Sequence, residues 1–132
     1  MTNRLPLLIG DWLVLLLFVF IGQRDHNITG PAALPSLLIT TLSVAVPWSL
    51  AAAALGAFRL DEGLTLPRWL GRVLNAWLVA APLGLVLRAL LRGQSAIAVP
   101  FMLVMLGLGG LFMLAWRAGV FYVIRRRNRV AA

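Results

Sequence analysis

The stretch LPLLIGDWLVLLLFVFIG, residues 5–22, is an apolar run that contains a single charged residue, Asp11. Its length is close to the roughly 20 residues that a helix needs to cross a bilayer. A charge at the centre of such a helix costs about 2.5–3.5 kcal/mol, so it usually faces a partner or a water-filled cavity rather than lipid. The run therefore predicts a membrane-spanning helix with a polar site on the side that faces other helices.

Three more apolar runs follow, at about residues 32–58, 69–91 and 96–124. Apolar residues make up 61% of the 132-residue chain and its mean hydropathy is +0.94, which is more apolar surface than a soluble domain of this size can bury. The runs are also too long and too uniformly apolar for the alternation of a membrane β-barrel. We expect one domain, residues 1–132, with an all-α fold: an integral membrane bundle of four transmembrane helices.

The arginines predict how the bundle is oriented. All 12 basic residues are arginine, against 4 acidic residues, and the formal net charge is +8. One side of the membrane would hold Arg4, Arg59, Arg68, Arg72 and the C-terminal cluster, and the other Arg24, Arg92 and the nearby Arg88. Because positive loops stay inside, both the N- and the C-terminus should be cytoplasmic, with Trp12, Trp69, Trp116 and Tyr122 at that interface. Arginine without lysine is typical of a GC-rich gene, so we expect the cell membrane of a bacterium or archaeon.

The basic charge indicates a lipid partner rather than a nucleic acid. The arginines lie at helix ends and at the C-terminus instead of covering one face of a soluble domain. Anionic lipid headgroups attract such juxtamembrane clusters. The arginines expected at the membrane surface are Arg125, Arg126, Arg127 and Arg129.

Two charged residues are predicted to lie at similar depth inside the bundle. With a rise of about 1.5 Å per residue, Asp11 lies about 9 Å and Arg117 about 10 Å from the same end. Arg72 and Asn75 would enter the third helix at a similar level. Asp11 either forms a buried ion pair with Arg117 that fixes helix register, or binds a solute or proton in exchange for Arg117, or simply reaches the interface.

A second group of polar residues is expected at the opposite end of the bundle, comprising Arg24, Asp25, His26, Arg88, Arg92 and Gln94. Arg88 has three possible roles: it snorkels outward, pairs with Asp25, or holds an anion. His26 is either a solvated turn residue or an external pH sensor. The candidate ligand-site residues of the chain are therefore Asp11, Arg24, His26, Arg88 and Arg117.

The sequence carries no recognisable catalytic motif. It has no nucleophile elbow, no HExxH, no P-loop and no dinucleotide fingerprint. The absence of cysteine and the single histidine make a metal site within one chain implausible, and the sequence leaves any cofactor unknown. We therefore do not expect an enzyme.

Several short motifs along the chain resemble those of a known family. They are Asp11, the turn Gly22-x-Arg24-x-His26, Pro47, the segment Gly84-Leu85-Val86-Leu87-Arg88, Phe101 and the pair Trp116-Arg117. In order and spacing they are similar to the four-helix bacterial and archaeal membrane family known as domain of unknown function 3054. The resemblance covers nearly the whole chain and implies an integral membrane protein, without implying an activity or a substrate.

Two interpretations of function remain open. Charged residues at depth favour a small transport or solute-binding module, which would need a homodimer to enclose a path. The small-residue faces, Ala51–Ala54 with Gly56 and Gly107, Gly109 and Gly110, and the five tryptophans favour an accessory subunit of a larger membrane complex that binds lipid, quinone or pigment.

Overall fold

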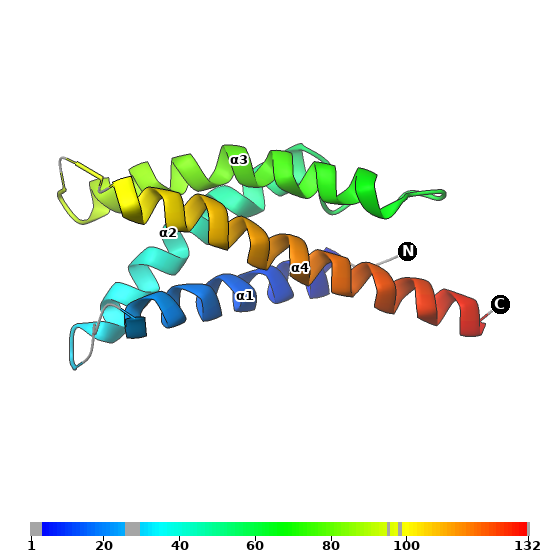
Figure 1. Ribbon diagram of the computed structural model, residues 1–132, viewed down its shortest axis with the longest axis horizontal. Helices are drawn as coiled ribbons and strands as arrows, with labels where there is room; N and C mark the ends of the chain where they lie inside the picture. Colours follow the sequence, from blue (N-terminus) through cyan, green and yellow to red (C-terminus); the bar gives the residue numbers. More distant parts are fainter. Residues whose placement is uncertain (1–3, 26–29, 95, 98, 132) are drawn as a thin grey trace.

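The computed structural model describes residues 4–25, 30–94, 96–97 and 99–131, and it places four helices and no strand in these ranges. The helices are α1 (Arg4–Asp25), α2 (Ala33–Ala54), α3 (Leu66–Leu91) and α4 (Val99–Ala131), as Figure 1 shows. The prediction of an all-α bundle of four helices is confirmed.

All four helices are long and apolar enough to cross a membrane. Their outer faces expose large apolar side chains; examples are Leu13 on α1, Leu50 on α2, Leu83 on α3 and Leu111 on α4. Surface of this kind is stable in lipid and unfavourable in water. The chain is therefore a multi-pass membrane protein.

The helices run alternately in opposite directions and form a ring. α2 packs against α1 and α3, and α4 packs against α3 and α1, with the most extensive interface between α2 and α3. The start of α1 lies at the same end of the bundle as the end of α4 and the connection from α2 to α3 (Figure 1). The last turns of α4 project past the start of α1 (Figure 1).

The bounds of α2 and α4 differ from the predicted spans of residues 32–58 and 96–124. α2 ends at Ala54 because Gly56 adopts a left-handed conformation, φ +76°, and the N–H of Ala57 bonds the carbonyl of Ala52 at 2.9 Å. This turn ends the helix although Ala57 and Phe58 stay buried. α4 begins at Val99 and continues through the arginine cluster to Ala131, because arginine is a good helix former.

Glycines allow the helices to approach closely at the ring's interfaces. A Cβ on Gly84 would lie 2.9 Å from the carbonyl oxygen of Ser43, so α3 passes directly against the backbone of α2. A Cβ on Gly109 would lie 2.6 Å from Cζ2 of Trp77. Trp48, Trp69 and Trp77 are fully buried and fill the centre. Small residues on α3 and α4 thus accept backbone and indole surfaces that larger side chains would displace.

The Gly109 contact gives a first prediction. Gly109→Ala should lower the stability of the bundle by about 1–3 kcal/mol, because the new methyl group overlaps the Trp77 ring. The matched control is Gly107→Ala, where a Cβ meets nothing within 4 Å and better helix propensity should leave stability unchanged or slightly higher. Thermal unfolding in detergent measures both, and equal melting temperatures for the two variants would contradict the packing.

The cytoplasmic placement of both termini stays a prediction, and reporter fusions test it. A reporter fused after Ala132 should be active in the cytoplasm, because eight of the arginines lie at or near that end of the bundle. A fusion after Gln94, between α3 and α4, should report the opposite side. An exported reporter at Ala132 together with a cytoplasmic one at Gln94 would reverse the assignment.

Candidate functional site

Asp11 and Arg117 form an ion pair in the interior of the bundle. Both side chains have no exposed surface. Arg117 Nη2 donates to Asp11 Oδ2 at 2.6 Å, and its Nε donates to Oδ1 at 3.0 Å. The pair is therefore bidentate, the geometry in which arginine binds a carboxylate most strongly. It joins the first helix to the last and is one of the three alternatives that the sequence left open for Asp11.

Two tryptophans complete the hydrogen bonding of the Asp11 carboxylate. Trp48 Nε1 donates to Oδ2 and Trp116 Nε1 donates to Oδ1, each at 2.9 Å. Gly10 leaves the space that the Trp116 ring occupies, since a Cβ there would collide with it. The carboxylate thus receives four donors, two at each oxygen, which is all that it can accept in good geometry.

The remaining terminal nitrogen of Arg117 reaches the turn that follows α2. Its Nη1 donates to the carbonyl oxygen of Ala57 at 2.8 Å, and Trp69 Nε1 donates to the same oxygen at 2.8 Å. The guanidinium carbon also lies 5.0 Å from the ring centroid of Phe58 and 5.3 Å from that of Trp69. We call Asp11, Trp48, Ala57, Phe58, Trp69, Trp116 and Arg117 the Asp11–Arg117 cluster; it ties all four helices together.

The geometry of this cluster favours a structural role over a solute-binding role. Both oxygens of Asp11 and all three nitrogens of Arg117 are already bonded within the protein, and three aromatic rings lie near the guanidinium. A solute could bind the carboxylate only after Arg117 had moved away. A buried Asp11 was interpreted either as part of an ion pair that fixes helix register or as a carboxylate that binds a solute or proton. The ion pair agrees better with these contacts.

Arg88 and Arg92 occupy a different environment, at the opposite end of the bundle. Arg88 Nε donates to Thr40 Oγ1 at 3.1 Å, and its guanidinium lies 4.5 Å from the ring centroid of Phe101. Arg92 Nη2 donates to the hydroxyl of Ser36. We call these five residues the Arg88–Arg92 site. The sequence predicted the two arginines, but Ser36 and Thr40 were missed. The available signal was their four-residue spacing on α2, which matches the spacing of Arg88 in the last turn of α3 and Arg92 at its C-cap.

The donors of the Arg88–Arg92 site are only partly used. Nε of Arg92 is buried without a hydrogen-bond partner among the described residues, and neither terminal nitrogen of Arg88 bonds one of them. Gln23 Nε2 and Thr41 Oγ1, near this same end, are also buried and unpartnered there. Buried polar atoms without partners are rare in proteins, and an unseen water, ion or ligand is a common reason.

The other predicted polar residues lie apart from these two groups. Arg24 is exposed on the last turn of α1 and stacks on Phe20 of the same helix, at 5.5 Å. Arg72 pairs with Asp61 at 3.0 Å near the surface rather than joining Asp11, and Asn75 is exposed. His26 lies outside the described residues. The four membrane-surface arginines, Arg125, Arg126, Arg127 and Arg129, are exposed on the final turns of α4.

A scan against known families matches residues 8–120 to the family described as "Protein of unknown function (DUF3054)". The chain belongs to this family. The match to DUF3054 includes the Asp11–Arg117 cluster and the Arg88–Arg92 site, and it ends before the four arginines on the final turns of α4. No curated protein and no solved structure matches the chain. Among the described residues there is no group of three or more histidine, cysteine, aspartate or glutamate side chains that could hold a metal ion.

The closed ion pair gives a further prediction. Asp11→Asn should destabilise the protein by about 3–5 kcal/mol, because it leaves the Arg117 charge buried without its counter-charge. Asp61→Asn makes the same chemical change in the exposed pair with Arg72 and should cost less than about 1 kcal/mol. Unfolding in detergent compares the two. An Asp11→Asn protein that unfolds like the wild type would favour the solute- or proton-binding interpretation instead.

Proposed function

We propose that this protein is a small anion-binding module of the membrane, and that it binds its solute at the Arg88–Arg92 site rather than at Asp11. The observation that carries the proposal is the pair of arginines one helical turn apart, neither of which has a carboxylate partner among the described residues. Each is instead held by a hydroxyl group of α2. Two neighbouring guanidinium groups that keep unused N–H donors form a site for a negatively charged group.

The electrostatics of the site support an anion as its ligand. Like charges four residues apart on a helix repel each other and destabilise it by a few tenths of a kcal/mol. An anion that bridges Arg88 and Arg92 would replace this repulsion with attraction to both. The planar guanidinium group suits oxyanions such as phosphate and carboxylate, to which it donates two parallel hydrogen bonds.

The contacts of the site also reduce the cost of binding. Thr40 and Phe101 hold the guanidinium of Arg88 from two sides, and Ser36 holds that of Arg92. Long side chains that are already oriented lose little rotational freedom when the ligand arrives. Preorganisation of this kind distinguishes a binding site from arginines that only snorkel to the headgroups.

The proposal is for binding rather than conduction. A path along the axis of one bundle would pass through the space that Trp48, Trp69 and Trp77 fill. Transport would therefore need a second copy, with the path between the copies, or a large separation of the helices. The second candidate is the accessory subunit of a membrane complex, which the projecting end of α4 supports (Figure 1). A heteromeric partner or pigment that co-purifies with the protein would favour it.

Binding of inorganic phosphate to the detergent-purified protein tests the proposal. Phosphate should raise the unfolding temperature in a saturable way, with about 2.7 kcal/mol of added stability at one hundred times Kd, whereas chloride at equal ionic strength should not. The double variant Arg88→Gln, Arg92→Gln should lose at least about tenfold in affinity, since each charged hydrogen bond contributes about 1.5–3 kcal/mol.

The control removes the same charge elsewhere. Arg24→Gln with Arg129→Gln takes away two exposed arginines and should leave phosphate affinity within about twofold, because surface charges in water contribute little. Equal loss in both double variants would mean that phosphate responds only to net charge. No saturable shift with phosphate, sulfate or acetate would contradict an anion site.

A further inference from the structure

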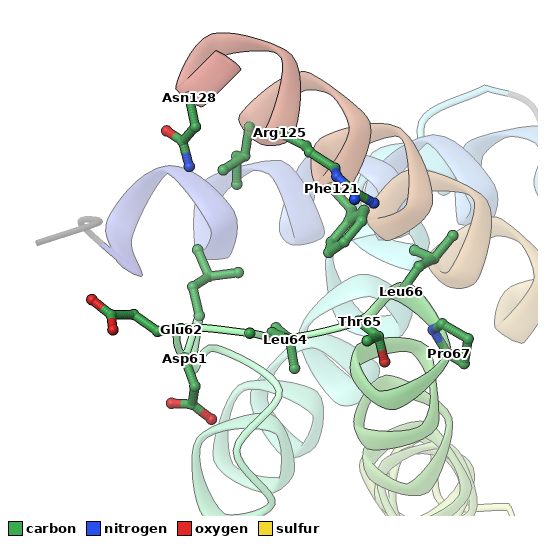
Figure 2. A pocket seen from close by; sticks show the side chains of 12 residues that line it. Asp61, Glu62, Leu64, Thr65, Leu66, Pro67, Phe121, Arg125 and Asn128 are labelled. Carbon is green, nitrogen blue, oxygen red and sulfur yellow. The ribbon is translucent and has the colours of Figure 1, made fainter. Parts of the chain in front are cut away.

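A groove of about 600 Å³ lies at the other end of the bundle, between α4 and the connection from α2 to α3 (Figure 2). The connection contributes residues 60–65, α3 contributes its first two residues, and α4 contributes Phe121, Ile124, Arg125 and Asn128. This volume is in the range of sites that bind small molecules. The groove shares no residue with the Arg88–Arg92 site.

The lining of the groove changes from apolar to polar along α4. Phe121 and Ile124 end the apolar part of that helix, and Arg125 and Asn128 lie one turn further, where the exposed arginine cluster begins. Leu64 and Leu66 face them from the connection and from α3. The groove therefore crosses the boundary between hydrocarbon and headgroups, with an apolar part and a cationic part side by side.

The charges around the groove favour an anionic occupant. Four exposed arginines lie on the final turns of α4, and such a cluster attracts anionic lipid. Of the two acidic residues in the connection, Asp61 is already paired with Arg72 at 3.0 Å. Figure 2 shows the carboxylates of Asp61 and Glu62 directed away from α4, while Phe121 and Asn128 extend from α4 toward the connection. The cationic wall of the groove is thus the one available to a ligand.

We propose that this groove is a binding site for one anionic phospholipid, with the phosphate group at Arg125 and Asn128 and the first part of an acyl chain against Phe121, Ile124 and Leu64. An amphiphile fits both parts of the lining, whereas a free phosphate would leave the apolar part exposed to water. Both the amide of Asn128 and the guanidinium of Arg125 can donate hydrogen bonds to phosphate oxygens. This site is independent of the anion site at Arg88 and Arg92.

Native mass spectrometry of the detergent-solubilised protein tests the site. One molecule of phosphatidylglycerol should remain bound per chain, with retention of phosphatidylcholine at least about tenfold weaker and no retention of soluble glycerol phosphate. Leu64→Trp, which fills the groove without changing charge, should abolish this retention. Arg88→Gln with Arg92→Gln should leave it unchanged, so failure of the anion site and failure of the lipid site can be told apart.

A matched pair of charge variants separates the groove from general attraction to the arginines. Arg125 lines the groove and Arg127 does not. An arginine near a charged membrane surface contributes about 1 kcal/mol, or roughly fivefold in affinity, so Arg127→Gln should weaken retention by about fivefold or less. Arg125→Gln should weaken it by well over tenfold.

Several results would overturn the proposal. Equal losses in the two arginine variants, or normal retention in Leu64→Trp, would mean that the arginines bind lipid without the groove. Glycerol phosphate bound as well as phosphatidylglycerol would make it a site for free phosphate. A dimer that Leu64→Trp dissociates would assign the groove to a second copy of the chain.

Discussion

A carboxylate and a guanidinium that have left water must find all of their hydrogen bonds within the protein, and the arrangement of the four helices follows from this constraint on Asp11 and Arg117. Each helix, or the turn that follows it, supplies a charged group or a hydrogen-bond partner to this cluster. α1 and α4 bring the two charges together, α2 supplies Trp48 and the chain after its end supplies the Ala57 carbonyl, and α3 supplies Trp69. A shift of any helix by one turn would leave a buried charge or N–H without a partner, so the cluster specifies one register among the many that apolar faces alone would allow.

The tryptophans show how the same requirement extends through the bundle. The interfacial position expected for Trp12, Trp69 and Trp116 stays a prediction. Each of the five indole N–H groups donates to an acceptor on another part of the chain. Trp77, for example, bonds the carbonyl oxygen of Leu106 on α4 while its ring packs on Gly109 and Gly110. In hydrocarbon an N–H without a partner is costly, so an indole that fills the interior must also direct its N–H toward an acceptor. The tryptophans thereby fix both the spacing and the rotation of the helices.

Properties that depend on local sequence were predictable, and those that depend on long-range partners were not. Hydropathy predicted four helices, and helical rise placed Asp11 and Arg117 at similar depth. The end of α2 was predicted four residues too late, because the residues after Gly56 are as apolar as those before it and only the left-handed glycine marks the turn. The two tryptophan donors to Asp11 and the hydroxyl groups that hold Arg88 and Arg92 were missed. These contacts join residues 37 to 105 positions apart and depend on how each helix is rotated, which the nearly uniform apolar sequence does not specify.

Depth explains why the two arginine sites differ so strongly. Arg117 has no exposed surface, and each of its three nitrogens is bonded within the protein. Arg92 lies at the end of α3 and Arg88 one turn inside it, where both residues are only partly buried and water or a solute can approach them. A cation at that level can keep free donors without destabilising the fold, and a cation enclosed by the helices cannot. Capacity to bind a solute is therefore expected where arginines are only partly buried at the ends of this bundle, and the enclosed charges of Asp11 and Arg117 serve to hold the helices together.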